Sequence, residues 1–403
     1  MSAAVVVELP PLPISGDAPT PILRLLAPGV LAFFSWLVYS KLQFTPKQHG
    51  RKLGVETSNL VDAYQHGIEG LDADQWRVKS LWIFPVKSCR GIEVAEARVV
   101  PSGLEHDRQF MFAEWKQNPK TGDHEWIFIT QRQYPKMALI TTEIYLEGEN
   151  NGNLHITFPL KTRLPFLKQA RTIRFPLLAS EDLKTMYPLK QIGIWKEQPL
   201  AYDISSAVEM ELKELSAHLG TKGPLALFRV CPDELREVYR NAPTVDEAGY
   251  QPVTGFADAY PLHMLNLTSV RELNSRIADK IPKLDIVRFR ANIILSGPSP
   301  FTEDDWKKIR LGAHVYYSGI TITNEQIACR TVRCRMPNVD PDTGEMHMQE
   351  PDQTMRSYRA IDPGYKHGAC LGMQLVPAVS MGILRAGDGV DVLETGPHHY
   401  TYQ

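Results

Sequence analysis

Cys334 lies among cationic side chains in the segment CRTVRCRMPNVDPDTGEM, residues 329–346. Arg333 and Arg335 flank it, and Arg330 is close in sequence. Neighbouring cations stabilise the thiolate form of a cysteine, and a thiolate can attack an electrophile or bind a soft metal. The opposing interpretation is a small buried side chain without chemistry, which is the usual role of a single cysteine.

The cysteines and histidines lack the spacing of a zinc site. Five cysteines are separated by 142, 98, 5 and 36 residues without a C-x-x-C pair, and His347 and His367 are scattered. A structural zinc site needs about four ligands. The sparse, odd set of cysteines indicates a reducing compartment. The aspartates of DPDTG, 340–344, lack the preceding hydrophobic strand of phosphatase-like enzymes, so we expect a turn there.

The segment PVKSCRG, 85–91, follows a hydrophobic run and offers donors at the exit of a predicted strand. Lys87, Ser88 and Arg90 supply two cations and a hydroxyl, and loops at strand ends commonly carry binding groups. Exposed cations beside a turn usually contact only solvent. By itself this segment is weak evidence for a site.

The segment VRFRANIILSG, 287–297, predicts a strand with two different faces. Its apolar residues alternate with Arg288, Arg290 and Asn292, so the three polar side chains would share one face. Two guanidiniums and an amide could bind a phosphate or a polar heterocycle. The same face could also simply meet solvent at a sheet edge.

Composition and missing motifs exclude several classes of protein. The 403 residues include 44 Lys and Arg against 46 Asp and Glu, so a field of one sign that would track nucleic acid is absent. Hydrophobic residues form 43% and charged residues 22%, as in ordinary globular proteins. Walker A, G-x-G-x-x-G, H-E-x-x-H and G-x-S-x-G patterns are absent, which leaves nucleotide, nicotinamide, zincin and serine-hydrolase interpretations unsupported. We expect no nucleic-acid partner and, by default, a monomer.

Short β-runs separated by Gly, Pro and Asn turns dominate the chain after residue 80 and predict a mainly β (α+β) fold of sheets or barrels. They are residues 80–87, 92–100, 108–112, 126–130, 139–146, 154–158, 287–297, 314–323, 370–376 and 389–394.

Two helices are expected from capping boxes followed by apolar stripes. The first begins at Ser206 with Glu209 as its partner, and the second at Ser269 with Glu272. Their inward stripes are Val208, Leu212, Leu215 and Leu219 in the first helix and Val270, Leu273 and Ile277 in the second.

The N-terminal part predicts a tail at 1–20, a transmembrane helix at 21–40 and a linker at 41–76. Residues 25–40 carry no charge, and the span reaches twenty residues if Arg24 extends to the interface. Basic residues and no acid follow closely, which would place the body in the cytosol. A targeting peptide and a buried core helix are the alternatives. Within the linker, 61–71 could form a short helix.

Taken together, these segments resemble the MOSC-domain molybdenum enzymes, and specifically the membrane-anchored mitochondrial amidoxime reducing component family. The resemblance covers about residues 77–395 and the anchor arrangement. It rests on six segments in order: LWIFPVKSCRGIEV, HDR at 106–108, TQRQYPKMALI at 130–140, RFRANIILSG, RCRMPNVDPDTGEM and EPDQTMRSYR at 350–359.

The resemblance implies an N-terminal MOSC β-barrel domain at 77–205 and a MOSC β-barrel domain at 206–395, with a pyranopterin molybdenum cofactor between them. Cys334 would be the catalytic thiolate ligand of molybdenum. The residues implied in binding the cofactor are Lys87, Ser88, Arg108, Asp258, Arg290, Asn292, Val332 and Arg333.

This chain departs from the family pattern at two places. Asp258 is followed by Ala259 and Tyr260 where the family has two hydroxyl residues, and a Thr-Thr pair is replaced by Pro337 and Asn338. These departures put one cofactor contact in doubt and predict a different substrate preference.

The activity implied by the resemblance is reduction of N-hydroxylated compounds, such as amidoximes and hydroxylamines, at molybdenum. Electrons would come from cytochrome b5 and NADH-cytochrome b5 reductase, at a cytosol-facing body on the mitochondrial outer membrane. Alternatives are reduction of nitrite or another oxyanion, a carrier of cofactor or persulfide sulfur without redox turnover, and a degenerate binding module.

Overall fold

A computed structural model describes residues 50–119, 121–147, 151–160, 169–239, 241–317, 319–322, 325–378 and 381–398. The described residues belong to one compact unit that starts at Gly50. The predicted tail and the predicted transmembrane helix at 21–40 lie outside them. Within the described ranges, every helix is too short or too polar to cross a bilayer.

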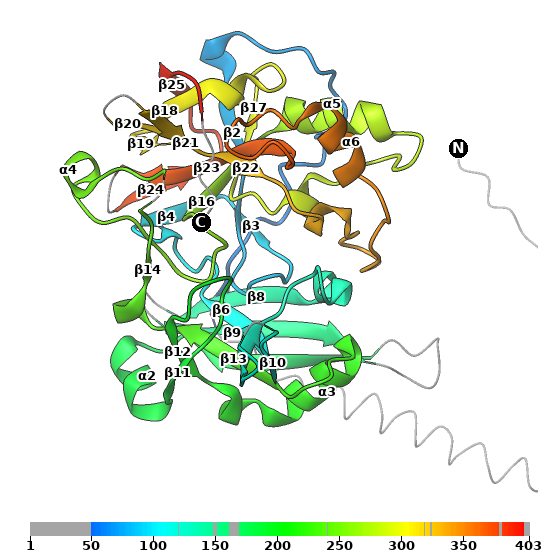
Figure 1. Cartoon of the computed structure of the whole chain (residues 1–403), viewed down its shortest axis with the longest axis vertical. Helices are drawn as coiled ribbons and strands as arrows, with labels where there is room; N and C mark the ends of the chain where they lie inside the picture. The colour runs from blue at the N-terminus through cyan, green and yellow to red at the C-terminus, as the bar shows by residue number, and fades with distance from the viewer. Residues whose placement is uncertain are drawn as a thin grey trace, which may run out of the picture. The chain divides into compact units, whose positions relative to one another are not determined.

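The largest sheet has nine strands and combines the early and late parts of the chain (Figure 1). Strands β16 and β17 pair in parallel, and the other neighbours are antiparallel. The order is β25 (Val390–Thr395), β18 (Trp306–Leu311), β19 (His314–Tyr317), β23 (Cys370–Pro377), β16 (Leu262–Asn266), β17 (Ile293–Ser296), β2 (Arg77–Ile83) and β3 (Ile92–Val94), with β22 (Arg330–Val332) on β23.

Two further sheets form the other end of the unit, which is the lower part of Figure 1. One has five strands in the order β11 (Leu189–Gln191), β12 (Leu200–Asp203), β13 (Leu225–Val230), β6 (Phe110–Gln117) and β7 (His124–Phe128). The other has four, in the order β1 (Arg51–Lys52), β8 (Thr141–Glu147), β9 (Asn151–Pro159) and β10 (Ala170–Pro176).

Smaller sheets and short helices complete the described fold. The sheets are β24 (Gly382–Arg385) with β4 (Glu96–Val100) and β5 (Gly103–Leu104), β14 (Arg236–Glu237) with β15 (Val253–Thr254), and β20 (Gly319–Ile322) with β21 (Glu325–Ala328). The α-helices are α2 (Ser180–Met186), α3 (Glu209–Leu219), α4 (Val245–Ala248), α5 (Leu267–Ile277) and α6 (Asp352–Tyr358).

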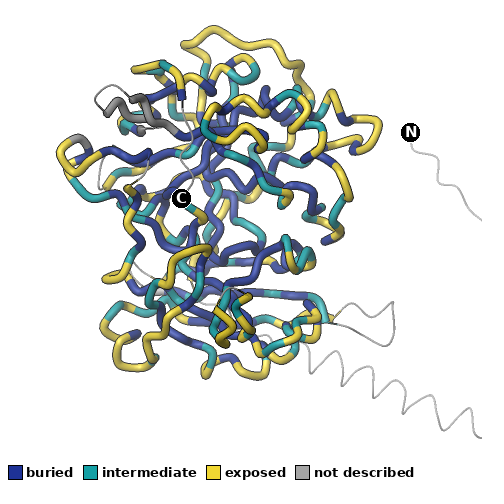
Figure 2. The backbone as a smooth tube through the Cα atoms, viewed as in Figure 1, coloured by how far each residue is buried: buried dark blue, intermediate teal, exposed yellow. Residues whose placement is uncertain are grey.

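Apolar side chains between the sheets supply the core, and Figure 2 shows buried backbone running through both ends of the unit. The mainly β fold predicted from the sequence is therefore confirmed. Strands on both sides of residue 205 share one sheet, because β13 pairs with both β12 and β6. Strands β2 and β3 join the nine-stranded sheet instead. The division of the chain at 205 and 206 remains a prediction.

The predicted strand at 287–297 is wrong over its first half. Residues Ile286–Phe289 form a 3₁₀ turn, whose start is capped because the Asp285 carboxylate accepts the Val287 N–H at 2.9 Å. Arg290 then takes a left-handed conformation with φ of 56°. Extended structure begins only at β17, so Arg288, Arg290 and Asn292 do not share one face of a strand as the alternation predicts.

The predicted helix starts are also wrong, although both apolar stripes are buried. Helix α3 begins at Glu209 after a 3₁₀ turn, so Ser206 does not cap it. Helix α5 begins at Leu267, and the Asn266 side chain accepts the Thr268 N–H at 3.2 Å. Asn266 caps the helix three residues earlier than Ser269 could, where its side chain reaches the first free N–H groups.

Residues 61–71 contain turns and no helix, which corrects the prediction for the linker. Val61, Ile68 and Leu71 are exposed, so the segment lacks the buried stripe that would stabilise a helix. The DPDTG turn is confirmed: the Asp340 carboxylate accepts the N–H groups of Asp342 and Thr343 at 2.8 and 3.0 Å.

Candidate functional site

A cavity of about 780 Å³ lies where the loops of the two sheet systems meet. Every site residue implied by the family resemblance lines it, although these residues are spread over almost 250 positions. They are Lys87, Ser88, Arg108, Asp258, Arg290, Asn292, Val332, Arg333 and Cys334. The structure thus brings the nine residues together, while their individual roles remain predictions. Arg288 is excluded from the cavity lining and pairs with Asp340.

Lys87 and Ser88 follow β2 in a loop fixed by backbone bonds. The Lys87 N–H donates to Phe110 O at 2.8 Å, and Gln131 donates to Ser88 O at 2.8 Å. Ser88 has a φ of 65°, an uncommon conformation for a residue with a side chain. This fixed, left-handed turn directs both side chains from the end of the strand into the cavity.

Arg108 is positioned by its neighbour Asp107. Both carboxylate oxygens of Asp107 accept from Arg108 Nη1, at 2.7 and 2.6 Å, and Asp107 also accepts the Phe84 N–H at 2.7 Å. Arg108 Nη2 donates to Arg290 O at 3.0 Å. The HDR segment therefore places a guanidinium beside Arg290 and holds it there.

Lys87 and Asp258 form an ion pair within the cavity. Lys87 Nζ lies 2.5 Å from Asp258 Oδ1 and 2.7 Å from Phe256 O. Burial lowers the pKa of Lys87 to about 8, although the Asp258 charge acts in the opposite direction. Burial would raise the pKa of Asp258, but the Lys87 ammonium outweighs this and lowers it. Asp258 therefore compensates the charge of Lys87, and its contact with the cofactor stays a prediction.

Arg236 holds the loop that carries Asp258. Its Nη1 donates to Gly255 O and Ala257 O at 3.1 and 2.7 Å, and its Nη2 donates to Asp258 O at 3.2 Å. Glu197 balances the Arg236 charge through an ion pair. The motifs gave no signal for Arg236, because its partners are backbone carbonyls that come together only in the fold.

Arg290 and Arg333 each direct an unpaired N–H group toward a buried region. Arg290 Nη1 donates to Cys89 O and Arg333 Nη2 to Phe289 O, the latter at 3.0 Å. Arg290 Nη2 and Arg333 Nε are buried without a hydrogen-bond partner among the described residues. Burial lowers the pKa of Arg290 to about 9 and that of Arg333 to about 10. Buried unpaired donors are costly, so a bound anionic group fits here.

His263 was missed by sequence reasoning and lies beside these arginines. Arg333 Nη1 is 3.2 Å from His263 Nε2, and burial together with Arg333 and Arg108 keeps the pKa of His263 well below its usual value. The neutral imidazole accepts from Arg333. Asn292 accepts the His263 N–H at 3.2 Å and donates to Trp82 O at 3.1 Å, so it ties β16 to β2.

Cys334 follows β22 and is half-buried, whereas the other four cysteines are buried. Cys329 also lines the cavity, but burial raises the pKa of its thiol to about 12. Cys334 thus combines a cavity position with some solvent access. Across the described residues, His, Cys, Asp and Glu do not gather in threes that could hold a metal ion.

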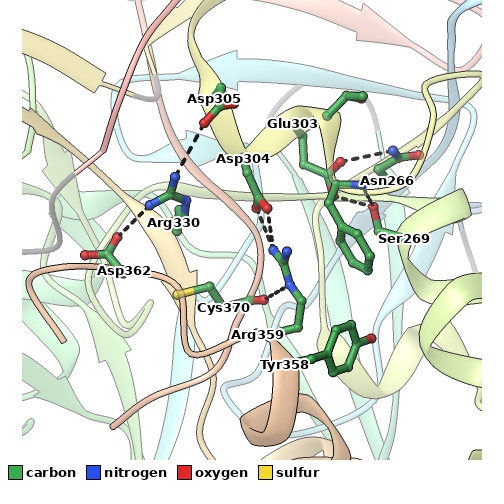
Figure 3. Close-up of polar contacts among 12 residues, drawn as sticks. Asn266, Ser269, Glu303, Asp304, Asp305, Arg330, Tyr358, Arg359, Asp362 and Cys370 are labelled. Atoms are coloured by element: carbon green, nitrogen blue, oxygen red, sulfur yellow. Dashed lines mark hydrogen bonds and ion pairs between the residues drawn. The ribbon is translucent and has the colours of Figure 1, made fainter. Parts of the chain in front are cut away.

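An ion-pair network that is buried except at Asp305 supports the segment that leads to Cys334 (Figure 3). Arg359 bonds both oxygens of Asp304, at 2.7 and 2.6 Å, and Cys370 O at 2.9 Å. Arg330 pairs with Asp362 at 3.4 Å and with Asp305 at 3.5 Å. Since Cys370 begins β23 and Arg330 begins β22, the network fixes two paired strands at the cavity.

The cavity lining is strongly cationic although the whole chain is nearly neutral. Ten Lys or Arg side chains line it against two carboxylates, Glu197 and Asp258, and both carboxylates pair with cations. This surplus and the two unpaired guanidinium donors suit an anionic ligand of the cavity's size.

Comparison with known proteins identifies the domains. Residues 75–188 match the MOSC N-terminal beta barrel domain, and residues 251–391 match the MOSC domain. The chain is a MOSC-domain protein. Both matched regions contribute to the cavity lining, since Lys87, Ser88 and Arg108 come from the first and Asp258, Arg290 and Cys334 from the second.

The two domain matches confirm the MOSC family predicted from the motifs, and several curated proteins are similar to most of the chain. Mitochondrial amidoxime reducing component 2 of Rattus norvegicus is 28% identical over 324 residues, covering 78% of this chain and 82% of the rat protein. Mitochondrial amidoxime-reducing component 1 of Xenopus laevis is 27% identical over 384 residues, or 92% and 91%. Molybdenum cofactor sulfurase of Oryza sativa is 28% identical over 324 residues, or 77% and 34%.

Proposed function

We propose that this MOSC protein binds a molybdenum cofactor and reduces N-hydroxylated compounds such as amidoximes and hydroxylamines. The observation that carries the proposal is the half-buried Cys334 thiol in one cationic cavity with two buried, unpaired guanidinium donors. The names of the relatives, amidoxime reducing component and molybdenum cofactor sulfurase, support this choice of cofactor and reaction.

The chain's own residues would bind and orient the cofactor. Cys334 would supply the thiolate ligand, with Val332 and Arg333 beside it, and the remaining contacts would come from Lys87, Ser88, Arg108, Arg290 and Asn292. The unpaired Arg290 and Arg333 donors suit a phosphate or a pterin carbonyl. Asp258 would limit the positive charge by pairing with Lys87. When bound, the molybdenum centre would supply the two-electron reduction of an N–O bond.

The reaction consumes two electrons and two protons for each N–OH group and releases an amine or amidine and water. We propose that cytochrome b5 and NADH-cytochrome b5 reductase supply the electrons, with the protein tethered by residues 21–40 to the mitochondrial outer membrane and its body in the cytosol. The word mitochondrial in the names of the relatives supports the organelle but says nothing of the membrane.

The direct test measures metal and activity in the same preparations. The full chain, produced in a host that makes the cofactor, should hold about one molybdenum per chain and reduce benzamidoxime with a chemical electron donor. Cys334→Ala should lose the reductase activity. Cys231→Ala is the matched control, because Cys231 is buried away from the cavity lining and hydrogen-bonds Tyr202. A wild-type protein without molybdenum would refute the proposal.

The similarity to a molybdenum cofactor sulfurase favours a second candidate, a carrier of cofactor or of persulfide sulfur without redox turnover. A carrier would contain molybdenum or a Cys334 persulfide and fail to reduce any N-hydroxylated compound. It would release cofactor to an acceptor enzyme that lacks it, or sulfur to an acceptor enzyme whose cofactor lacks that sulfur. Mass spectrometry of the intact protein and an acceptor-activation assay distinguish the two functions.

A further inference from the structure

A two-residue turn at the cavity presents an exposed indole. Ile194 and Glu197 exchange both backbone hydrogen bonds, each at 2.9 Å, with Trp195 and Lys196 between them. Trp195 is the first central residue and has a φ of 56°. Glycine is favoured there, because a left-handed conformation costs other residues roughly 1–2 kcal/mol. Backbone strain at a cavity-lining residue is a reason to look for a function.

The turn is held rigidly at its base. Gly193 exchanges backbone hydrogen bonds with β7, at 2.8 Å to Trp126 O and 3.1 Å from the Phe128 N–H. Glu197 pairs with Arg236, which in turn bonds the loop of Asp258. The strained residue is therefore fixed relative to the cavity, and its side chain cannot swing away with a loose loop.

The Trp195 side chain remains partly exposed to solvent although two side chains contact it. Phe128 packs against its edge at 5.0 Å, and the Arg132 guanidinium lies 4.4 Å from its ring centre. Trp195 nevertheless stays 47% exposed. Trp195 lines the cavity and is exposed, whereas Arg290 and Arg333 line it and are buried, which places Trp195 at the mouth.

Arg132 is a cation at the mouth whose guanidinium is only weakly hydrogen-bonded within the described part of the protein. Among the described residues, the hydrogen bond of its guanidinium is one long contact of 3.5 Å from Nε to Thr130 Oγ1. The two carboxylates of the lining form ion pairs with other cations, Glu197 with Arg236 and Asp258 with Lys87, although the Arg132 charge also acts on Asp258 and lowers its pKa. The planar donor fork of Arg132 is thus available for a ligand.

We propose that Trp195 and Arg132 form a rim subsite that selects aromatic substrates carrying a carboxylate. The proposal rests on the function proposed above and names the substrate class of the same cavity. The exposed indole packs against an aryl ring, and the Arg132 fork pairs with the carboxylate. The surplus of cations in the lining disfavours substrates with an added ammonium group.

Two variants and a conservative rescue test the rim subsite. Arg132→Gln removes the charge, and Trp195→Gly removes the indole while suiting the left-handed turn, so the fold is retained. Trp195→Phe keeps an aromatic face. The matched controls are Arg171→Gln and Trp115→Ala, since both residues are partly exposed and lie outside the cavity lining.

The substrates are benzamidoxime, 4-carboxybenzamidoxime and acetamidoxime. Arg132→Gln should raise the KM of the carboxylate substrate about tenfold and change the other two less than about twofold, with kcat retained. Trp195→Gly should raise KM for both aryl substrates about fivefold but spare acetamidoxime, and Trp195→Phe should restore most of the loss. Equal effects on neutral and anionic substrates, or on aryl and aliphatic ones, would overturn the subsite.

A binding measurement separates this inference from the proposed function. The molybdenum-loaded wild type and Arg132→Gln are titrated calorimetrically with 4-carbamoylbenzoate, which cannot be reduced, and with benzamide. Tighter binding of the carboxylate by wild type alone supports the subsite even if every amidoxime proves inert, in which case only the proposed reaction fails. If the protein reduces amidoximes but the wild type does not bind the carboxylate more tightly than benzamide, the subsite is refuted and the proposed function stands.

Discussion

Glu303 provides a test of the buried polar network with a sign that follows from the structure. Its side chain is fully buried, and it accepts hydrogen bonds from Ser269 Oγ at 2.6 Å and Asn266 Nδ2 at 3.0 Å (Figure 3). Burial, followed by the neighbouring Asp304 charge, raises the pKa of Glu303 to about 7. The two hydrogen bonds oppose the rise without cancelling it.

The raised pKa makes folding stability fall as pH rises. Below the ordinary value of 4.5, the folded and unfolded chains both hold the proton. Between pH 4.5 and about 7, the unfolded chain releases it while the folded chain keeps it, so the free energy of unfolding decreases. The full effect is about 3 kcal/mol and is complete above the folded pKa.

The assay is urea unfolding of wild type and Glu303→Gln at pH 5, 6, 7 and 8. Glutamine has one acceptor oxygen in place of two, so it loses one of the two hydrogen bonds at every pH, and it cannot ionise. Because that loss does not depend on pH, the pH dependence of the difference between the two proteins isolates Glu303 from all other titrating groups. The variant should gain up to about 3 kcal/mol over wild type between pH 5 and 8. A difference that stays constant or changes in the opposite direction would refute the reasoning.

Glu350→Gln is the matched control, because Glu350 is equally buried but pairs with Lys280 at 2.6 Å. Burial would raise the pKa of Glu350, but Lys280 and the Thr354 contacts outweigh burial and lower it. Its stabilisation is therefore fully present above pH 4.5 and is lost only in stronger acid. Over pH 5 to 8, this variant should be less stable than wild type by a constant amount.

Three further predictions concern a buried ion pair, a glycine beside Val332 and the N-terminal segment. Asp304→Asn should destabilise the fold by about 3–5 kcal/mol in urea unfolding, because it leaves the buried Arg359 charge uncompensated. Gly368→Ala places a Cβ 2.5 Å from Val332 Cγ1 and should cost about 1–3 kcal/mol and lower molybdenum content, measured by unfolding and metal analysis. Deletion of residues 1–42 should release the protein to the soluble fraction, whereas retention on membranes would exclude that segment as the tether.

The fold was predictable where periodicity decides the structure. The runs at 126–130, 139–146 and 154–158 correspond to β7, β8 and β9, since alternating apolar residues suit one buried sheet face. Periodicity failed at 287–292, where the same alternation occurs in a 3₁₀ turn and a left-handed residue. The Asp285 cap competes there with extended structure, and alternation gives no measure of that competition.

The sequence predicted which residues line the site but not which contacts they make with one another. The motifs named the residues around Cys334 and Arg290 that line one cavity. They could not show that Asp258 neutralises Lys87, because the two residues are 171 positions apart and meet only after both loops fold. Trp195 gave no signal at all, since an exposed tryptophan in a turn becomes informative only through its φ and its position at the mouth.

The arginines of the cavity show why such contacts cannot be predicted from a sequence. Carbonyl groups of Cys89 and Phe289 accept from Arg290 and Arg333, and Arg290 O accepts from Arg108. These backbone acceptors replace water around part of each guanidinium without neutralising its charge. Arg290 Nη2 and Arg333 Nε stay unpaired, so the fold holds two buried cationic donors at fixed positions that favour an anionic ligand. Because a residue of any type can supply a backbone carbonyl, a sequence motif identifies the arginines but not the acceptors that orient them.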